Sequence, residues 1–255
     1  MLSTRFIVVF LLGTLALAWI LPASWLKNGR LPTITSAPRS PWSTAVSIED
    51  VSWGNGSPYV RISVGETDMT LPLTGWSLEN ARGERVEIGL GVEEFSLGKI
   101  PLPTTIQVAS NTALFASFGP SPIGVSFREH VCSSYLRGTV PIVPPIEPRC
   151  PEPSTYPSWN SLDGTCRLLI SSLPRCEVIS PEHLGEMTPG CDAFLRTVPT
   201  YATCMSTLGS EALLPRWRVF FEGRPGFIRE EGGSVTLRDE RGLVVDTFTY
   251  ETIGL

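Results

Sequence analysis

The segment over residues 234–250 carries the pattern that most limits what this chain can fold into. It reads Ser-Val-Thr-Leu-Arg-Asp-Glu-Arg-Gly-Leu-Val-Val-Asp-Thr-Phe-Thr-Tyr and predicts two β-strands joined by a tight turn. The turn over 239–242 ends in Gly242, which adopts a positive φ at little cost. Because the second strand has apolar side chains on both faces, we expect it inside a sheet rather than at an edge. A hairpin alone is marginally stable in water, so its partner strands must come from elsewhere in the chain.

Short strand patterns occur at both ends of the remaining sequence. They cover residues 46–52, 59–64, 69–73, 76–78, 85–88 and 217–222, and turn residues separate them. This spacing predicts an antiparallel β-sandwich, and the 23 Gly and 23 Pro agree with a turn-rich β protein. Trp76 and Trp217 lie within these patterns, so we expect both indoles in the core.

The character of the sequence changes between the two groups of strands. We predict one domain over residues 45–255, interrupted by a cysteine-rich and partly helical insertion over residues 111–215. Apolar residues at three- and four-residue spacing predict a helix that begins at Asn160 and ends before Pro174. A second short helix is expected over residues 191–198.

All six cysteines lie in the predicted insertion, and they are Cys132, Cys150, Cys166, Cys176, Cys191 and Cys204. Their even number and the absence of any Cys-x-x-Cys pair favour three disulfides in an oxidising compartment over a zinc site. Fifteen pairings are open. If the two predicted helices are antiparallel, Cys176 pairs with Cys191 and Cys166 with Cys204, which leaves Cys132 with Cys150.

The N-terminal region contains an apolar run over residues 6–26, which is about long enough to cross a bilayer as a helix. We therefore predict a transmembrane signal anchor over residues 1–28 and a flexible stalk over residues 29–44. The alternative is a secretory signal cleaved near Ala16-Leu17-Ala18, which would release the protein. Both interpretations place the C-terminal domain outside the cytoplasm, and the first predicts a single-pass cell-membrane protein.

Several of these segments together resemble the lamin-tail domain. The resemblance rests on residues 59–62 (Tyr-Val-Arg-Ile), 73–78 (Leu-Thr-Gly-Trp-Ser-Leu) and the 234–250 hairpin. Residues 121–136, 166–170 and 217–219 are similar to bacterial lamin-tail proteins with a cysteine-rich insertion. The resemblance spans most of residues 46–251, although Arg61 stands where the family usually has Glu. It implies an immunoglobulin-like β-sandwich that acts as an interaction or scaffolding module.

Catalytic chemistry finds little support in the sequence. His130 and His183 occur in no ligand or triad pattern, and Glu93 and Glu94 are neighbours that point apart. No calcium loop or Gly-rich phosphate loop is present, so we expect no metal and no cofactor. The alternative is an exported hydrolase or phosphoesterase that uses His130 or His183 as a base, with a shallow site at the insertion.

A non-catalytic binding, adhesion or scaffolding role at the cell surface is the function that we predict. Its partner would be an unknown protein, a cell-surface polymer or, through exposed sheet edges, a second copy of the chain. Tyr135, Tyr156, Trp159 and Tyr201 are the candidate contact residues, and packing of a small core is the alternative for them. The net charge of −5 makes nucleic acid an unlikely partner, so extracellular DNA binding is a weaker alternative.

Overall fold

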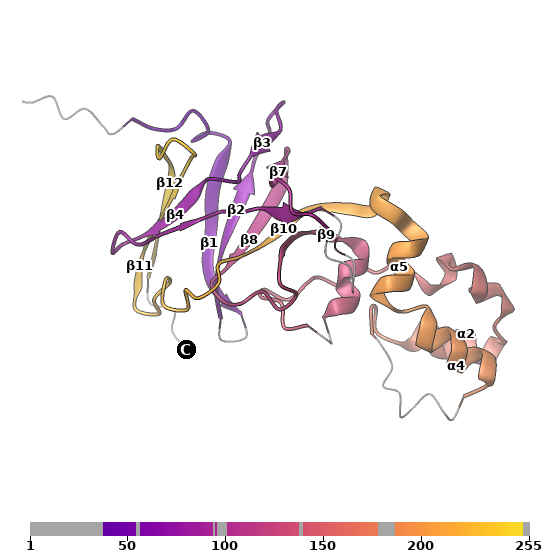
Figure 1. Cartoon of the computed structure of the whole chain (residues 1–255). Helices are drawn as coiled ribbons and strands as arrows, with labels where there is room; N and C mark the ends of the chain where they lie inside the picture. Colours follow the sequence, from indigo (N-terminus) through magenta and orange to yellow (C-terminus); the bar gives the residue numbers. More distant parts are fainter. Residues whose placement is uncertain are drawn as a thin grey trace, which may run out of the picture. The chain divides into compact units, whose positions relative to one another are not determined.

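The structure is a computed structural model that describes residues 38–54, 57–93, 95, 101–137, 140–177 and 187–251. Its elements belong to one unit, which spans Arg39–Leu255. Figure 1 labels most of the strands and α-helices. The protein is mainly β, as predicted, with a helical region that lies between β9 and β10 in the sequence.

The larger sheet has six strands in the order β1-β2-β8-β10-β9-β6. Its strands are β1 (Val46–Gly54), β2 (Ser57–Val64), β8 (Thr112–Ser117), β10 (Leu213–Phe220), β9 (Ser126–His130) and β6 (Gly91–Val92). β10 lies parallel to β8, and β6 lies parallel to β9. The sheet is therefore mixed rather than antiparallel throughout, because β10 enters between β8 and β9 after a long connection.

The smaller sheet has four antiparallel strands in the order β12-β11-β4-β5. They are β12 (Val244–Glu251), β11 (Gly232–Arg238), β4 (Ser77–Asn80) and β5 (Arg85–Glu87), and β3 (Leu71–Pro72) pairs with β7 (Gln107–Val108) separately. β11 and β12 form the predicted hairpin, with Gly242 at a φ of 77° in its turn.

β12 is an edge strand, which corrects the prediction that it lies inside a sheet. Its inward face packs against the other sheet, and the Ile48 amide of β1 donates to the Asp246 carboxylate at 2.8 Å. Near its start, the Ser40 amide donates to the Val244 carbonyl at 2.8 Å, so the incoming chain covers part of this edge. The apolar residues on both faces thus reflect coverage by another sheet and by a neighbouring segment.

The two sheets share one hydrophobic core. Trp76 and Trp217 are each 1% exposed at its centre, which confirms the prediction for both indoles. Side chains that alternate between the two faces of each strand supply further core contacts. Val235 and Leu237 of β11 are fully buried, whereas Thr236 between them points outward. Gly91 is required where it stands, because a Cβ there would lie 2.8 Å from the Trp217 ring.

The predicted stalk and anchor fall largely outside the described residues, including the whole of the 1–28 segment. The end of the predicted stalk belongs to the folded unit, since Arg39 bridges Val244 and Ser40 is 2% exposed. In the part of the chain that the structure describes, no helix is long and apolar enough to span a membrane.

The cysteine-rich segment, which we define as residues 131–212, leaves the larger sheet after β9 and returns at β10. His130 and Leu213 are register partners on these adjacent strands, so its two ends meet. Its elements are η1 (Val131–Leu136), η2 (Pro153–Thr155), η3 (Pro157–Ser161), α2 (Gly164–Ser172), α4 (Pro189–Thr197), α5 (Tyr201–Leu208) and η4 (Gly209–Ala212). The predicted insertion began too early, at residue 111, because β8 and β9 are strands of the larger sheet.

The two predicted helices are present with shifted ends. α2 begins at Gly164 rather than at Asn160, since Asp163 is its N-cap and accepts from the Cys166 amide at 2.8 Å. The same carboxylate accepts from Thr188 at 3.1 Å, and this residue precedes α4. A further helix, α5, was not predicted and lies between the second predicted helix and β10.

Candidate binding pocket in the cysteine-rich segment

Three of the four aromatic residues proposed for binding line one pocket. Tyr135, Tyr156 and Trp159 border a cavity of about 310 Å³ within the cysteine-rich segment. Tyr201 does not line the pocket. It packs with Tyr135 in a hydrophobic cluster next to the larger sheet, where its hydroxyl donates to the Phe95 carbonyl. The four residues therefore do not form one surface.

The pocket is built by short elements that are far apart in the sequence. Phe194, Leu195 and Val198 line it from α4 and its C-cap, and Ile170 and Leu173 line it from the end of α2 and the residue after it. η2 and η3 contribute the wall that carries Tyr156 and Trp159. Prolines stand at the starts of both 3-10 helices, where a fixed φ favours the first turn.

The disulfides fix these walls to one another. The pairs are Cys132–Cys204, Cys150–Cys176 and Cys166–Cys191. All six predicted cysteines are paired, but each of the three predicted pairs is wrong. Cys166–Cys191 joins α2 directly to α4, Cys150–Cys176 closes the pocket beside Arg175, and α5 carries Cys204 back to η1.

The tyrosines of the pocket are buried with their hydroxyls. Tyr135 is 7% exposed and Tyr156 is 3% exposed. Burial raises the pKa of both phenols, and the neighbouring Tyr135 phenol raises that of Tyr156 further. No described residue forms a hydrogen bond of normal geometry with the Tyr156 hydroxyl. These two residues form the floor of the pocket, while Trp159 is only half-buried.

Charged side chains stand at the mouth of the pocket. Arg175, Glu152 and Glu177 are all exposed and all line the cavity. The Arg175 Nε donates to the Cys150 carbonyl at 2.9 Å, which holds the guanidinium near the Tyr135 phenol. Among the described residues none of the three takes part in an ion pair, and all three are exposed where they can contact a ligand in the cavity.

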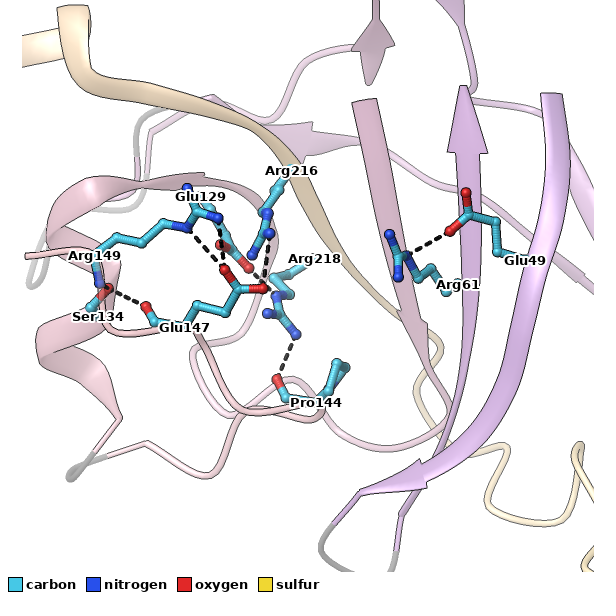
Figure 2. Close-up of polar contacts among 9 residues, drawn as sticks. All are labelled: Glu49, Arg61, Glu129, Ser134, Pro144, Glu147, Arg149, Arg216 and Arg218. Atoms are coloured by element: carbon cyan, nitrogen blue, oxygen red, sulfur yellow. Dashed lines mark hydrogen bonds and ion pairs between the residues drawn. The ribbon is translucent and has the colours of Figure 1, made fainter. Parts of the chain in front are cut away.

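A second polar cluster joins the cysteine-rich segment to the larger sheet (Figure 2). Arg218 of β10 and Glu129 of β9 form an ion pair with exposed side-chain fractions of 1% and 0%. Arg218 also donates to the Pro144 carbonyl at 2.6 Å, and its guanidinium lies 4.4 Å from the centre of the Phe115 ring. Burial lowers the pKa of Arg218, although the guanidinium stays charged and the Glu129 carboxylate opposes the shift.

The segment over residues 140–149 lies along the outer face of this sheet. The Ser117 hydroxyl of β8 donates to the Val143 carbonyl at 2.6 Å. Glu147 pairs with Arg216 of β10 at 2.9 Å and with Arg149 at 2.8 Å, and hydrogen bonds from these arginines lower its pKa. In Figure 2 the Glu49–Arg61 ion pair stands apart from this group. Polar contacts thus hold residues 140–149, a segment with four prolines, against the outer face of the larger sheet.

The contacts that His130 makes with described residues are structural rather than catalytic. His130 is 2% exposed, its Nδ1 accepts from the Cys132 amide at 3.0 Å, and its Nε2 lies 2.8 Å from the Gly209 carbonyl. Because Nδ1 is an acceptor, Nε2 carries the proton and donates it to this carbonyl. His183 and Glu94 lie outside the described residues. Glu93 pairs with Arg128 at 3.7 Å.

The described part of the chain holds no group of three His, Cys, Asp or Glu side chains arranged for a metal ion. The charged mouth of the pocket and the Glu129–Arg218 pair were not predicted from the sequence. An arginine between Trp217 and Val219 in an apolar strand was a signal for the buried ion pair, because a buried cation needs a partner.

The chain was also compared with known proteins. No protein-family model matches it, and no curated protein is significantly similar to it. The lamin-tail resemblance therefore stays a prediction.

Proposed function

We propose that the protein is a membrane-tethered, extracytoplasmic binding module without catalytic activity. In this proposal an immunoglobulin-like sandwich of the lamin-tail type presents the cysteine-rich segment to a protein or polymer at the cell surface. The observation that carries it is the aromatic-lined pocket whose walls are fixed by disulfides.

The disulfides support a location outside the cytoplasm. Three cystines persist in oxidising compartments and are rare where glutathione and thioredoxin keep thiols reduced. The apolar run over residues 6–26 supplies the membrane attachment in this proposal.

The environment of His130 favours binding over hydrolysis. A general base must reach its proton donor through a free ring nitrogen, whereas both nitrogens of His130 bond to backbone groups, the Cys132 amide and the Gly209 carbonyl. The imidazole caps η1 and ties it to Gly209, which is a structural role. The exported hydrolase thus has no specific support from this residue.

The distribution of arginines weighs against nucleic acid. Five exposed arginines each pair with a carboxylate, and they are Arg61, Arg82, Arg149, Arg196 and Arg229. Phosphate binding needs cations that are clustered and uncompensated. The pocket offers instead a small enclosed site with prefixed walls, and such preorganisation lowers the entropy lost on binding.

Two measurements test this function. Mass spectrometry of the full-length protein from membranes, with and without reductant and alkylation, should give an intact N-terminus and three disulfides. Protease added to intact cells should digest the C-terminal domain. Free thiols, or protection from external protease, would refute the proposed location.

The binding role is tested with isolated envelopes of the producing cells. Full-length protein in detergent should co-sediment with them, and Trp159→Ala should weaken this retention about tenfold or more. Leu168→Ala is the matched control, since Leu168 lies on α2, is 75% exposed and does not line the pocket. Equal retention of both variants and the parent would refute a role for the pocket.

A further inference from the structure

The size of the pocket limits its ligand. At about 310 Å³ it lies at the lower end of small-molecule sites. That volume accommodates a single ring with its substituents rather than a folded segment or a long chain. A polymer would therefore insert one terminal or branching unit.

The walls favour a ligand with an apolar face. Four rings line the cavity, and those of Tyr135, Tyr156 and Phe194 are buried while Trp159 remains half-exposed. The Phe194 ring meets the Trp159 indole edge-on with centres 6.1 Å apart, which fixes the indole from one side. An accessible indole held in this way offers a flat apolar surface at low entropic cost.

The mouth favours a ligand that both donates and accepts hydrogen bonds. Glu152 and Glu177 offer carboxylate acceptors, and Arg175 offers guanidinium donors beyond the Nε that binds Cys150. Hydroxyl groups satisfy both kinds of partner. Hydrogen bonds to charged side chains are also stronger than those between neutral groups.

The signs of these charges argue against an ionic ligand. An anion would meet two carboxylates, and a cation would meet Arg175, whose charge already acts on the Tyr135 phenol at the floor. A neutral molecule with several hydroxyls avoids both penalties.

We infer that the pocket binds one neutral sugar unit of a cell-surface polysaccharide. The ring face of the sugar packs on Trp159, and its hydroxyls bond to Arg175, Glu152 and Glu177. This inference rests on the proposed binding function and names the chemistry of its ligand.

The test is a titration of full-length protein in a detergent without a sugar headgroup. The probes are the methyl glycosides of glucose, galactose, mannose and N-acetylglucosamine, with glucuronate and choline as charged comparisons. Binding is followed by saturation-transfer difference NMR and by tryptophan fluorescence. We expect saturable binding of at least one neutral glycoside, about tenfold weaker in Trp159→Ala and unchanged in Leu168→Ala.

A further pair of variants separates the ligand classes. Trp159→Phe keeps a ring and should retain part of the affinity, which guards against a folding defect in Trp159→Ala. Glu152→Gln with Glu177→Gln keeps hydrogen-bonding oxygens, so a sugar should still bind. A pocket that instead recognised a cation through these carboxylates would lose its binding of choline in this double variant.

The outcomes test the sugar inference and the proposed binding function separately. Binding of choline or glucuronate alone, or no glycoside binding that depends on Trp159, overturns the sugar inference. If envelope retention still depends on Trp159 in that case, the binding function stands and only the ligand class is wrong. Loss of both results refutes the pocket as a binding site.

Discussion

The two parts of the folded unit are stabilised in different ways. The strand region, residues 39–130 and 213–251, buries 26 hydrophobic residues in one cluster between its sheets and contains no disulfide among the described residues. Within the cysteine-rich segment, a separate cluster over residues 156–198 buries eight hydrophobic residues. All three disulfides lie in this segment, which has short helices and no strand pairing of its own in the described residues.

The difference follows from the ratio of surface to volume, which limits how much apolar area each region can bury. A short segment without a sheet cannot bury enough apolar area to offset its conformational entropy, so covalent links restrict the unfolded chain instead. The strand region therefore supplies a stable support, and the cysteine-rich segment supplies a pocket whose walls are held by covalent links. Contacts such as Arg218–Pro144 and Tyr201–Phe95 join the two.

The largest expected effect comes from the core of the strand region. Trp217→Ala removes a fully buried indole that packs on Gly91 and should lower the free energy of unfolding by about 3–5 kcal/mol. Trp159→Ala, a matched change at a half-buried site, should cost about 1 kcal/mol or less of global stability. Chemical denaturation followed by far-ultraviolet circular dichroism measures both. Similar losses in the two variants would show that the regions unfold as one cooperative unit with comparable cores.

The strand region was the easier part to predict, and for a physical reason. Alternating burial leaves a period of two in the sequence, so β1, β2, β5 and the β11–β12 hairpin could be predicted from side chains alone. β8 has buried residues on both faces and thus no alternation, and β9 follows a Pro- and Gly-rich turn. Their place in the sheet depends on partners distant in sequence, which periodicity does not report.

The next largest effect is expected at the buried ion pair of the strand region that lies beside the junction, where Arg218 also donates to the Pro144 carbonyl. Glu129→Ala leaves the Arg218 charge buried without its partner and should cost about 3 kcal/mol or more. The double variant Glu129→Leu with Arg218→Met removes both charges and should recover most of that loss. Thermal unfolding of the parent, the single and the double variant measures this. A double variant no more stable than Glu129→Ala would contradict the assignment of the loss to an unpaired charge.

Removal of one disulfide should show most clearly that the two regions differ in what stabilises them. Cys166→Ser with Cys191→Ser opens a link of 25 residues' separation and should destabilise the cysteine-rich segment by about 2–3 kcal/mol. Hydrogen exchange should then speed up in α2 and α4, while the amides of β2 and β8 keep their protection. Faster exchange across the larger sheet would mean that the sheet depends on the segment after all.

The pocket could be predicted only in part. Tyr135, Tyr156 and Trp159 were identified by their residue types, but their common cavity arises from the disulfide pairing, which spacing does not determine. The predicted pairs assumed two antiparallel helices. The third helix, α5, returns Cys204 to η1 and so changes every partner. Arg175 gave no sequence signal, because its place at the mouth follows from Cys150–Cys176 beside it.

The smallest effect is expected at the hairpin turn of the strand region. The Asp239 Oδ1 accepts from the Arg241 amide at 3.0 Å and from the Leu243 amide at 2.9 Å. Burial alone would raise the pKa of Asp239, but hydrogen bonds from Ser40 and from these two amides outweigh it, and its pKa lies below the ordinary value. Asp239→Asn keeps an acceptor oxygen and loses the charge, so it should cost less than about 1 kcal/mol near neutral pH.

This cost should depend on pH in a defined direction. Because the folded-state pKa is lowered, the charged Asp239 stabilises the fold above its unfolded-state pKa of about 4, and the contribution is lost as the pH falls through the folded-state value. The stabilities of the parent and of Asp239→Asn should therefore converge in acid, as measured by urea unfolding between neutral pH and about pH 3. A constant difference over that range would mean that the carboxylate acts through its shape alone. In that case the turn of the strand region would be held by backbone geometry, as the cysteine-rich segment is held by its covalent links.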